Sequence, residues 1–273
     1  MHLFRWLFFL LLELVLFGYS DMDLDGVDDA IDKCPSTPFS ELVDESGCSV
    51  EKLSPPPLYT LLLGFDYIQD DPKTLGLTST YMESVEIDYN YQHYSLQLQT
   101  SYFTTKSDNY NQKGLYDTYL SGGYIFGLKD GWILQPTLGV ILPTYKSTYH
   151  NNKTDYFASL YIAKDYNTVT FFTTLGYTFV NDDDITTDTY KLAYQNTLSY
   201  LLGTSLTINP NLFCSLSWSK SENIYRGVEP VRLLLATLSY FLTQNSFALL
   251  GGSYGLSQSA SDYTFSLKLG YNF

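Results

Sequence analysis

Charged side chains are scarce in this sequence. Only 16% of the 273 residues are Asp, Glu, Lys or Arg, whereas 26 tyrosines and 17 phenylalanines are present. Lysine and arginine number 15 against 29 acids, which gives a net charge of −14, and the basic residues form no patch. Without such a patch the chain cannot neutralise a phosphate backbone, so nucleic-acid binding is excluded. The aromatic enrichment favours the pleated surfaces of β-strands.

Long apolar runs are missing after residue 20. No later stretch stays apolar over the roughly 18 residues that a membrane-spanning helix requires. The start differs: residues 2–19, HLFRWLFFLLLELVLFGY, carry Arg5 before an apolar core, and Gly18 and Ser20 supply the small residues of a cleavage site. Residues 1–20 are therefore predicted to be a secretory signal peptide. An uncleaved membrane anchor is the alternative.

The negative charge is concentrated just after this segment. Residues 21–52 hold ten acids and two lysines, a net charge of −8, which leaves −6 for residues 53–273. The predicted ligand positions of a calcium loop of the EF-hand kind, counted from 1 to 12, fall on Asp21, Asp23, Asp25, Val27 (through its carbonyl), Asp29 and Asp32. Gly26 at position 6 permits the sharp turn that such a loop needs. We therefore expect Ca²⁺ as a cofactor; a solvated acidic linker is the alternative.

The residues that follow extend this pattern. Residues 34–48 read CPSTPFSELVDESGC. With the preceding aspartates, DxDxDGxxDxxDxCP followed by TP, VD and GC resembles a thrombospondin type 3 repeat, as found in the linkers of OmpA-type outer-membrane proteins. The resemblance implies a calcium-binding repeat at residues 21–52. In an exported chain Cys34 and Cys48 are then expected to form a disulfide. Residues 53–57, LSPPP, are predicted to be a proline-rich linker.

From residue 58 onwards apolar and polar side chains alternate. The last segment, DYTFSLKLGYNF, places six apolar residues on one face of a strand and polar residues on the other. Similar segments number about twelve, an even number that is typical of bacterial membrane barrels: 58–69, 80–92, 94–105, 115–127, 131–145, 154–165, 168–180, 188–207, 212–221, 229–242, 246–257 and 262–273. Residues 58–273 are therefore predicted to form an all-β antiparallel transmembrane β-barrel. A soluble β-sandwich is the alternative, but its water-facing side should carry more charge.

The connections and the last residue indicate the compartment. Short turns alternate with longer polar loops, which predicts that both termini of the barrel lie on the periplasmic side and that the longer loops lie outside the cell. The terminal aromatic Phe273 resembles the C-terminal strand signature of bacterial outer-membrane barrels. This resemblance implies the outer membrane of a Gram-negative bacterium, with its lipid and the barrel-assembly machinery as partners. The repeat at residues 21–52 would then lie in the periplasm.

The alternation also predicts which charges face the lumen: Asp66, Glu86, Asp88, Asp117, Asp155, Lys191, Arg232 and Lys268. Opposed acids and bases would set a transverse field in a narrow channel or passive transporter for small solutes. Alternatively the charges pair across a closed lumen, and the protein is a structural or interaction protein. Some outer-membrane lipid hydrolases use a His-x-Ser arrangement, which His93 and Ser95 match in spacing. His93 falls in a turn and the residues after Ser95 depart from that pattern, so no enzyme is expected.

Overall fold

The computed structural model describes residues 23, 27–29, 31–37, 41–52, 58–71, 77–107, 111–145, 153–186 and 191–273. The predicted signal peptide, the predicted linker at residues 53–57 and two predicted calcium ligands, Asp21 and Asp25, lie outside the described residues. The chain divides into two compact units, Met1–Pro56 and Pro57–Phe273. Among the described residues, no helix is long and apolar enough to cross a membrane.

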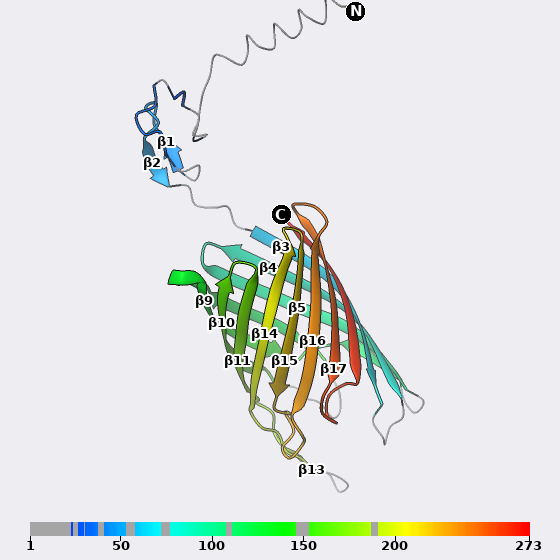
Figure 1. Ribbon diagram of the computed structural model, residues 1–273. Coiled ribbons are helices and arrows are strands. Elements are labelled where there is room, and N and C mark those ends of the chain that lie inside the picture. Colours follow the sequence, from blue (N-terminus) through cyan, green and yellow to red (C-terminus); the bar gives the residue numbers. More distant parts are fainter. Residues whose placement is uncertain are drawn as a thin grey trace, which may run out of the picture. The chain divides into compact units, whose positions relative to one another are not determined.

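The second unit is a closed antiparallel barrel of twelve strands, as its sequence predicts (Figure 1). Its strands are β3 (Leu58–Asp70), β4 (Thr78–Tyr91), β5 (Tyr94–Ser107), β7 (Thr118–Tyr124), β9 (Trp132–Leu142), β10 (Asp155–Tyr166), β11 (Val169–Phe179), β14 (Thr197–Asn209), β15 (Leu212–Ser221), β16 (Val231–Phe241), β17 (Ser246–Gly255) and β18 (Tyr263–Asn272). Two short strands, β6 (Asn111–Leu115) and β8 (Phe126–Gly127), extend the position of β7 at its two ends. Antiparallel pairing of β18 with β3 closes the sheet on itself.

The two ends of the barrel differ in their connections. Two-residue turns join β4 to β5 and β10 to β11, and Gln92 and Asn167 adopt the positive φ angles that tight hairpin turns require. The C-terminus lies at this short-turn end, while β13 (Lys191–Leu192) lies at the opposite, loop end (Figure 1).

One predicted strand is wrong in its extent. The sequence predicts a single strand over residues 188–207, but β14 begins only at Thr197, which pairs with Thr178 of β11. The preceding residues form a separate loop structure, in which β13 pairs with β12 (Ile185–Thr186) and Tyr194 bridges to Tyr225. A period of two continues through both pieces, so alternation alone does not show where the barrel strand begins.

The outward surface of the barrel is apolar. Leu138 and Leu202 are 70% and 53% exposed, and among the described residues no large side chain is fully buried. Exposed aromatic side chains lie on this surface near both ends of the strands: Tyr59, Tyr94, Trp132, Tyr166, Tyr240 and Tyr271 towards the short turns, and Tyr81, Tyr102, Tyr156, Tyr177, Tyr254 and Tyr263 towards the loops. A leucine-rich band between two aromatic belts is the surface that a bilayer matches.

Glycines on the inner face of the barrel accommodate aromatic rings from neighbouring strands. A Cβ atom at Gly139 would lie 2.4 Å from the Phe157 ring, and one at Gly203 would lie 2.4 Å from the Phe172 ring. Gly270 and Phe247 form a third such pair. These rings therefore lie flat against the wall, which keeps them out of the centre of the lumen.

Replacing Gly139 by valine should destabilise the barrel by about 1–3 kcal/mol, the usual cost of overpacking. The Phe157 ring would have to move, and the Leu120 backbone oxygen, 2.8 Å from the added Cβ, leaves little room. Urea unfolding in lipid vesicles measures the difference. Gly252→Val is the matched control, because the nearest atom to a Cβ there is the Thr264 backbone oxygen at 3.6 Å. Equal losses in both variants would contradict this packing.

Candidate functional site

The lumen is walled mainly by small and polar side chains. Residues that pair directly across strands share a face, so the register fixes the inward set. On β15 the outward face carries exposed Leu216, whereas the inward face places Ser215, Ser217, Ser219 and Ser221 in a row. A twelve-stranded barrel is wider than an eight-stranded one, which side chains fill. Serines cannot fill this width.

Four of the predicted inward charges gather on one side of the lumen. Asp66 on β3, Glu86 and Asp88 on β4, and Lys268 on β18 form what we call the charged wall. The Lys268 Nζ atom lies 3.2 Å from Glu86 Oε2. It reaches across β3 at Gly64, where an added Cβ would lie 3.2 Å from Lys268 Cγ. The predicted opposition of acids and bases across the lumen is therefore wrong for Lys268, because the pairing of β18 with β3 places this lysine beside the acids.

Neutral polar groups complete the hydrogen bonding of the charged wall. Gln97 Nε2 donates to Glu86 Oε1 at 2.8 Å, and the Ser266 hydroxyl donates to Asp66. Three acids and one lysine give the wall a net charge of −2. A cavity of about 330 Å³ lies against Lys268 and is lined also by Thr237, Leu249 and Ser266. The wall is thus accessible from within the lumen.

Two further predicted residues lie near the loop end. Asp117 and Asp155 both line a cavity of about 420 Å³ formed by β7, β9, β10, β11 and β14, which we call the loop-end cavity. Asp155 is buried and accepts a hydrogen bond from the Asn181 backbone amide at 2.8 Å. Asp117 accepts one from the Tyr145 amide at 3.2 Å.

The assignment of Arg232 to the lumen is wrong. Arg232 pairs with Lys220 and shares a face of β16 with the exposed Leu234 and Leu238, so it belongs to the outward face. It forms an ion pair with Glu229 near the loops. Lys191 lies on β13, in the loop region and not on a barrel strand, and its side chain is outside the described residues.

Alternation did not single out Asp182, which lies between β11 and β12. Burial raises the pKa of Asp182 to about 6, and the charge of Asp155 adds to this effect. The nearby Lys153 opposes it but forms its ion pair with Asp183, at 2.6 Å. The sequence shows Asp182–Asp184 as an acidic run, but only the structure shows that this run lies near Asp155.

The loop end should lose negative charge as the pH falls from about 7 to about 5, because Asp182 then gains a proton. The shift in the reversal potential of the purified protein across a salt gradient measures this loss. Asp182→Asn should remove the step, whereas Asp183→Asn, at an exposed carboxylate in the same loop, should retain it. A step that persists unchanged in Asp182→Asn would contradict the assignment.

The two residues with hydrolase spacing have different neighbours in the structure. His93 is exposed in the β4–β5 turn, and its ring contacts that of Tyr124, with centroids 5.5 Å apart. The Ser95 hydroxyl accepts a hydrogen bond from Gln135 Nε2 at 3.2 Å. Among the described residues, the recorded partner of the hydroxyl is thus an amide and not an imidazole.

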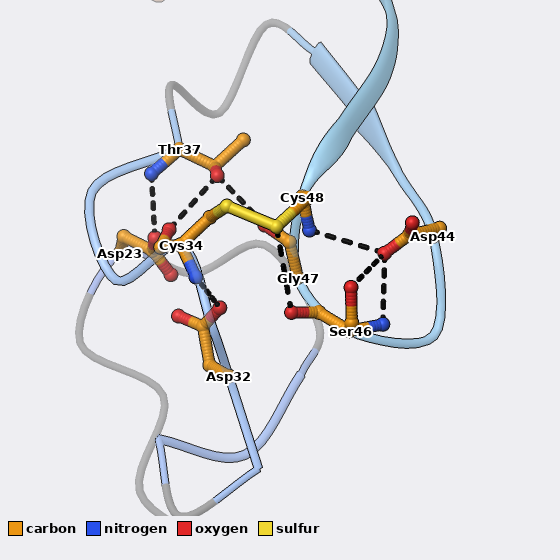
Figure 2. The surroundings of a disulfide bond; sticks show 8 residues. All are labelled: Asp23, Asp32, Cys34, Thr37, Asp44, Ser46, Gly47 and Cys48. Atoms are coloured by element: carbon orange, nitrogen blue, oxygen red, sulfur yellow. Dashed lines mark hydrogen bonds between the residues drawn. A yellow bond between two sulfur atoms is a disulfide. The ribbon is translucent and has the colours of Figure 1, made fainter.

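The N-terminal unit is organised around a disulfide. Cys34 and Cys48 are bonded, as predicted, with Cα atoms 5.1 Å apart. Figure 2 shows Asp23 and Asp32 beside this bond: Asp23 Oδ2 accepts from the Thr37 amide and Asp32 Oδ1 from the Cys34 amide, each at 2.7 Å. Strands β1 (Glu41–Val43) and β2 (Ser49–Lys52) form a small hairpin around the second cysteine.

In both of these aspartates, one carboxylate oxygen takes no part in these hydrogen bonds. Asp23 Oδ1 and Asp32 Oδ2 are buried without a hydrogen-bond partner. Such orphaned carboxylate oxygens fit the oxygen ligands that Ca²⁺ prefers. Within the described residues no three acidic, histidine or cysteine side chains form a group that could hold a metal ion. Asp21 and Asp25, which would complete the set, fall outside the described part of the chain.

Comparisons with solved structures support the barrel fold. No protein-family model matches the sequence, and no curated protein matches it. An outer-membrane channel from Pseudomonas putida F1 superposes with a TM-score of 0.65 at 13% identity, over 80% of this chain and 95% of its own. The NanC porin gives 0.58 at 13% identity, over 77% and 98%, and the KdgM porin 0.52 at 9%, over 78% and 99%. At such identities the likeness concerns the fold alone.

Proposed function

We propose that this protein is an outer-membrane channel of a Gram-negative bacterium that admits small solutes passively and prefers cations. One observation carries the proposal: a closed barrel with an apolar outer surface has a lumen lined by serines, threonines and an off-centre charged wall. Strands of 10 to 14 residues, apart from the interrupted position of β7, are long enough to cross a bilayer at a tilt. The similar solved structures named as a channel and as porins agree with this architecture.

The preference for cations follows from the inward charges. Five of the predicted lumen residues are acids, namely Asp66, Glu86, Asp88, Asp117 and Asp155, and Lys268 is the base that accompanies them. In a narrow space with low-dielectric walls such an excess raises the local concentration of ions of opposite charge. Cations should therefore enter more readily than anions.

Liposome swelling tests the passage of solutes. Vesicles that contain the folded protein should swell in small neutral sugars and amino acids, at rates that fall as solute size increases. The absence of swelling, with the barrel shown to be folded and inserted, would overturn the channel proposal. The Lys268–Glu86 ion pair would then stabilise a closed lumen. The protein would have a structural or interaction role in place of the proposed channel function.

We further propose that residues 21–52 form a calcium-binding, periplasmic module of the thrombospondin type 3 kind. The orphaned oxygens of Asp23 and Asp32 support this proposal. Asp21, Asp25, Asp29 and the Val27 carbonyl would supply the other ligands. The ion would cancel the mutual repulsion of the aspartates and hold the loop closed.

The C-terminal residues support delivery by the barrel-assembly machinery. Phe273 is exposed, its backbone amide donates to the Tyr59 carbonyl, and its ring contacts that of Tyr271 at 4.9 Å. A terminal aromatic on the closing seam of the barrel is a natural recognition point for the partner that folds it.

A further inference from the structure

Lys164 is a cation on the lipid-facing surface of the barrel. Its direct neighbours across the strands are Trp132 on β9 and Phe171 on β11, and both of these aromatic side chains are exposed on the outward face. The two-residue turn between β10 and β11 begins just after Tyr166. Lys164 therefore lies among the aromatic residues of the belt at the short-turn end, at the depth where lipid headgroups meet the apolar part of a bilayer.

Two aromatic rings and one carbonyl position the ammonium group of Lys164. Its Nζ atom lies 5.4 Å from the centre of the Trp132 ring and 5.3 Å from the centre of the Tyr166 ring, which is the range of cation–π contacts. The same atom donates a hydrogen bond to the Asp130 backbone carbonyl. An ammonium group has three N–H donors, so this single hydrogen bond leaves it able to bind an anion.

None of the acids that the structure describes forms an ion pair with Lys164. Asp165 is on the opposite, inward face of β10 and accepts a hydrogen bond from the Thr170 hydroxyl at 3.2 Å. The turn that supplies the carbonyl contains both Lys129 and Asp130, so it adds no net charge. A cation at the edge of a bilayer without an acidic partner is complementary to the anionic groups of lipids.

A groove in the outward surface begins beside this cation. Its volume is about 470 Å³, and its lining includes Ile162, Lys164, Phe171, Thr173 and Leu202. The groove exists because Thr173 is small and stands between Ile162 and Leu202, its neighbours on the two adjacent strands. The Thr173 hydroxyl donates to the Leu201 carbonyl at 2.9 Å, so the polar atom of this side chain is satisfied within the wall.

The groove leads from the belt towards the middle of the membrane. Strand residues advance by about 3.3 Å each, so Ile162 lies about 7 Å further along β10 from the short-turn end than Lys164 does. The cation thus stands at headgroup depth and the apolar groove continues from it at the depth of the acyl chains. A free phosphate ion would use the cation alone, whereas a phospholipid would use both features.

We propose that Lys164 and this groove bind one anionic phospholipid, with its phosphate at the ammonium group and an acyl chain along Ile162, Thr173 and Leu202. The proposal goes beyond the channel function. It rests on the proposed membrane location, in which the short-turn end of the barrel meets the periplasmic leaflet, and it does not require an open lumen.

Quenching of Trp132 fluorescence by brominated lipids tests the proposal, because Trp132 lies beside Lys164. The folded mature protein carries Trp218→Phe, so that Trp132 is the tryptophan of the barrel, and is placed in vesicles of phosphatidylcholine and phosphatidylglycerol. Brominated phosphatidylglycerol should associate about fivefold more strongly than brominated phosphatidylcholine, as expected for one lysine at the membrane surface. Lys164→Gln should lose this preference, and Lys164→Arg should retain it.

Two further variants separate the site from general attraction to the surface. Lys106→Gln is the matched control, since Lys106 is an outward cation 5.8 Å from the Tyr81 ring at the loop end, and it should keep the preference. Thr173→Phe fills the groove and leaves Lys164 in place, so it should lose most of the preference. Heat-modifiable migration in electrophoresis shows which variants are folded.

Four results would overturn the proposal: no preference in the parent, an unchanged preference in Lys164→Gln, an unchanged preference in Thr173→Phe, or displacement of the lipid by inorganic phosphate at millimolar concentration. The last result would assign the cation to free phosphate. Should Lys164→Gln fail to fold, Thr173→Phe decides the outcome. Quenching requires no conductance, so a lipid preference without solute passage would defeat the channel alone, and passage without a lipid preference would defeat the lipid site alone.

Discussion

Replacing Glu86 and Asp88 together by lysine should remove most of the preference of the pore for cations, because the net charge of the five inward acids and Lys268 rises from −4 to 0. The charged wall has three acids and one lysine, a net charge of −2; the double variant has one acid and three lysines, a net charge of +2. An inward charge within a few ångströms of a passing ion is worth about 1 kcal/mol even at the dielectric of water. The potassium-to-chloride permeability ratio should therefore fall by about tenfold or more.

The reversal potential in a potassium chloride gradient gives this ratio. Asp71→Lys with Asp183→Lys is the matched control, since it changes the net charge by the same amount on exposed side chains outside the strands. The control should shift the ratio far less, because salt screens exposed charges at these positions. If both double variants shift the ratio alike, the charged wall does not determine selectivity.

Removing the disulfide should strongly weaken the calcium binding that we propose for the N-terminal unit. In the chain-entropy model a cross-link around a loop of about 15 residues contributes roughly 3 kcal/mol. The unit is too small to build a core that replaces this contribution. Cys34→Ser with Cys48→Ser should therefore weaken calcium binding at least about a hundredfold, as measured by calorimetric titration of the folded full-length chain.

The folding of the barrel should not change in this variant, because each of the two units is compact by itself. Its heat-modifiable migration in electrophoresis should stay that of the parent. Cys214→Ser is the control, since Cys214 is the free cysteine on the outward face of β15. Undiminished calcium binding in the double serine variant would show that the acidic loop is held by something other than the disulfide.

The strands of the barrel could be predicted from sequence because its two environments differ so sharply. Lipid on one side and a wet lumen on the other impose a period of two, which β18 shows over its whole length. The same contrast places Asp66, Glu86, Asp88 and Lys268 on the inner face. They become neighbours because β18 pairs with β3, as is expected when the first and last strands of a barrel close it.

The pattern fails where the contrast weakens. Leu233, Leu234 and Leu235 are consecutive, so the start of β16 has no clear phase and Arg232 was placed on the wrong face. The start of β14 was misplaced because Tyr194 continues the alternation into a loop. Asp155 and Asp182 come close enough for the charge of one to raise the pKa of the other, and sequence spacing carries no signal of this proximity.

The central claim is that the lumen conducts, and single-channel recording of the refolded mature protein in a planar bilayer tests it most directly. We predict discrete, ohmic steps with a reversal potential that favours potassium over chloride, recorded with and without millimolar calcium. A calcium effect on the steps would connect the N-terminal unit to the pore. The absence of conductance steps from a barrel shown to be folded and inserted, or a preference for chloride, would contradict this account.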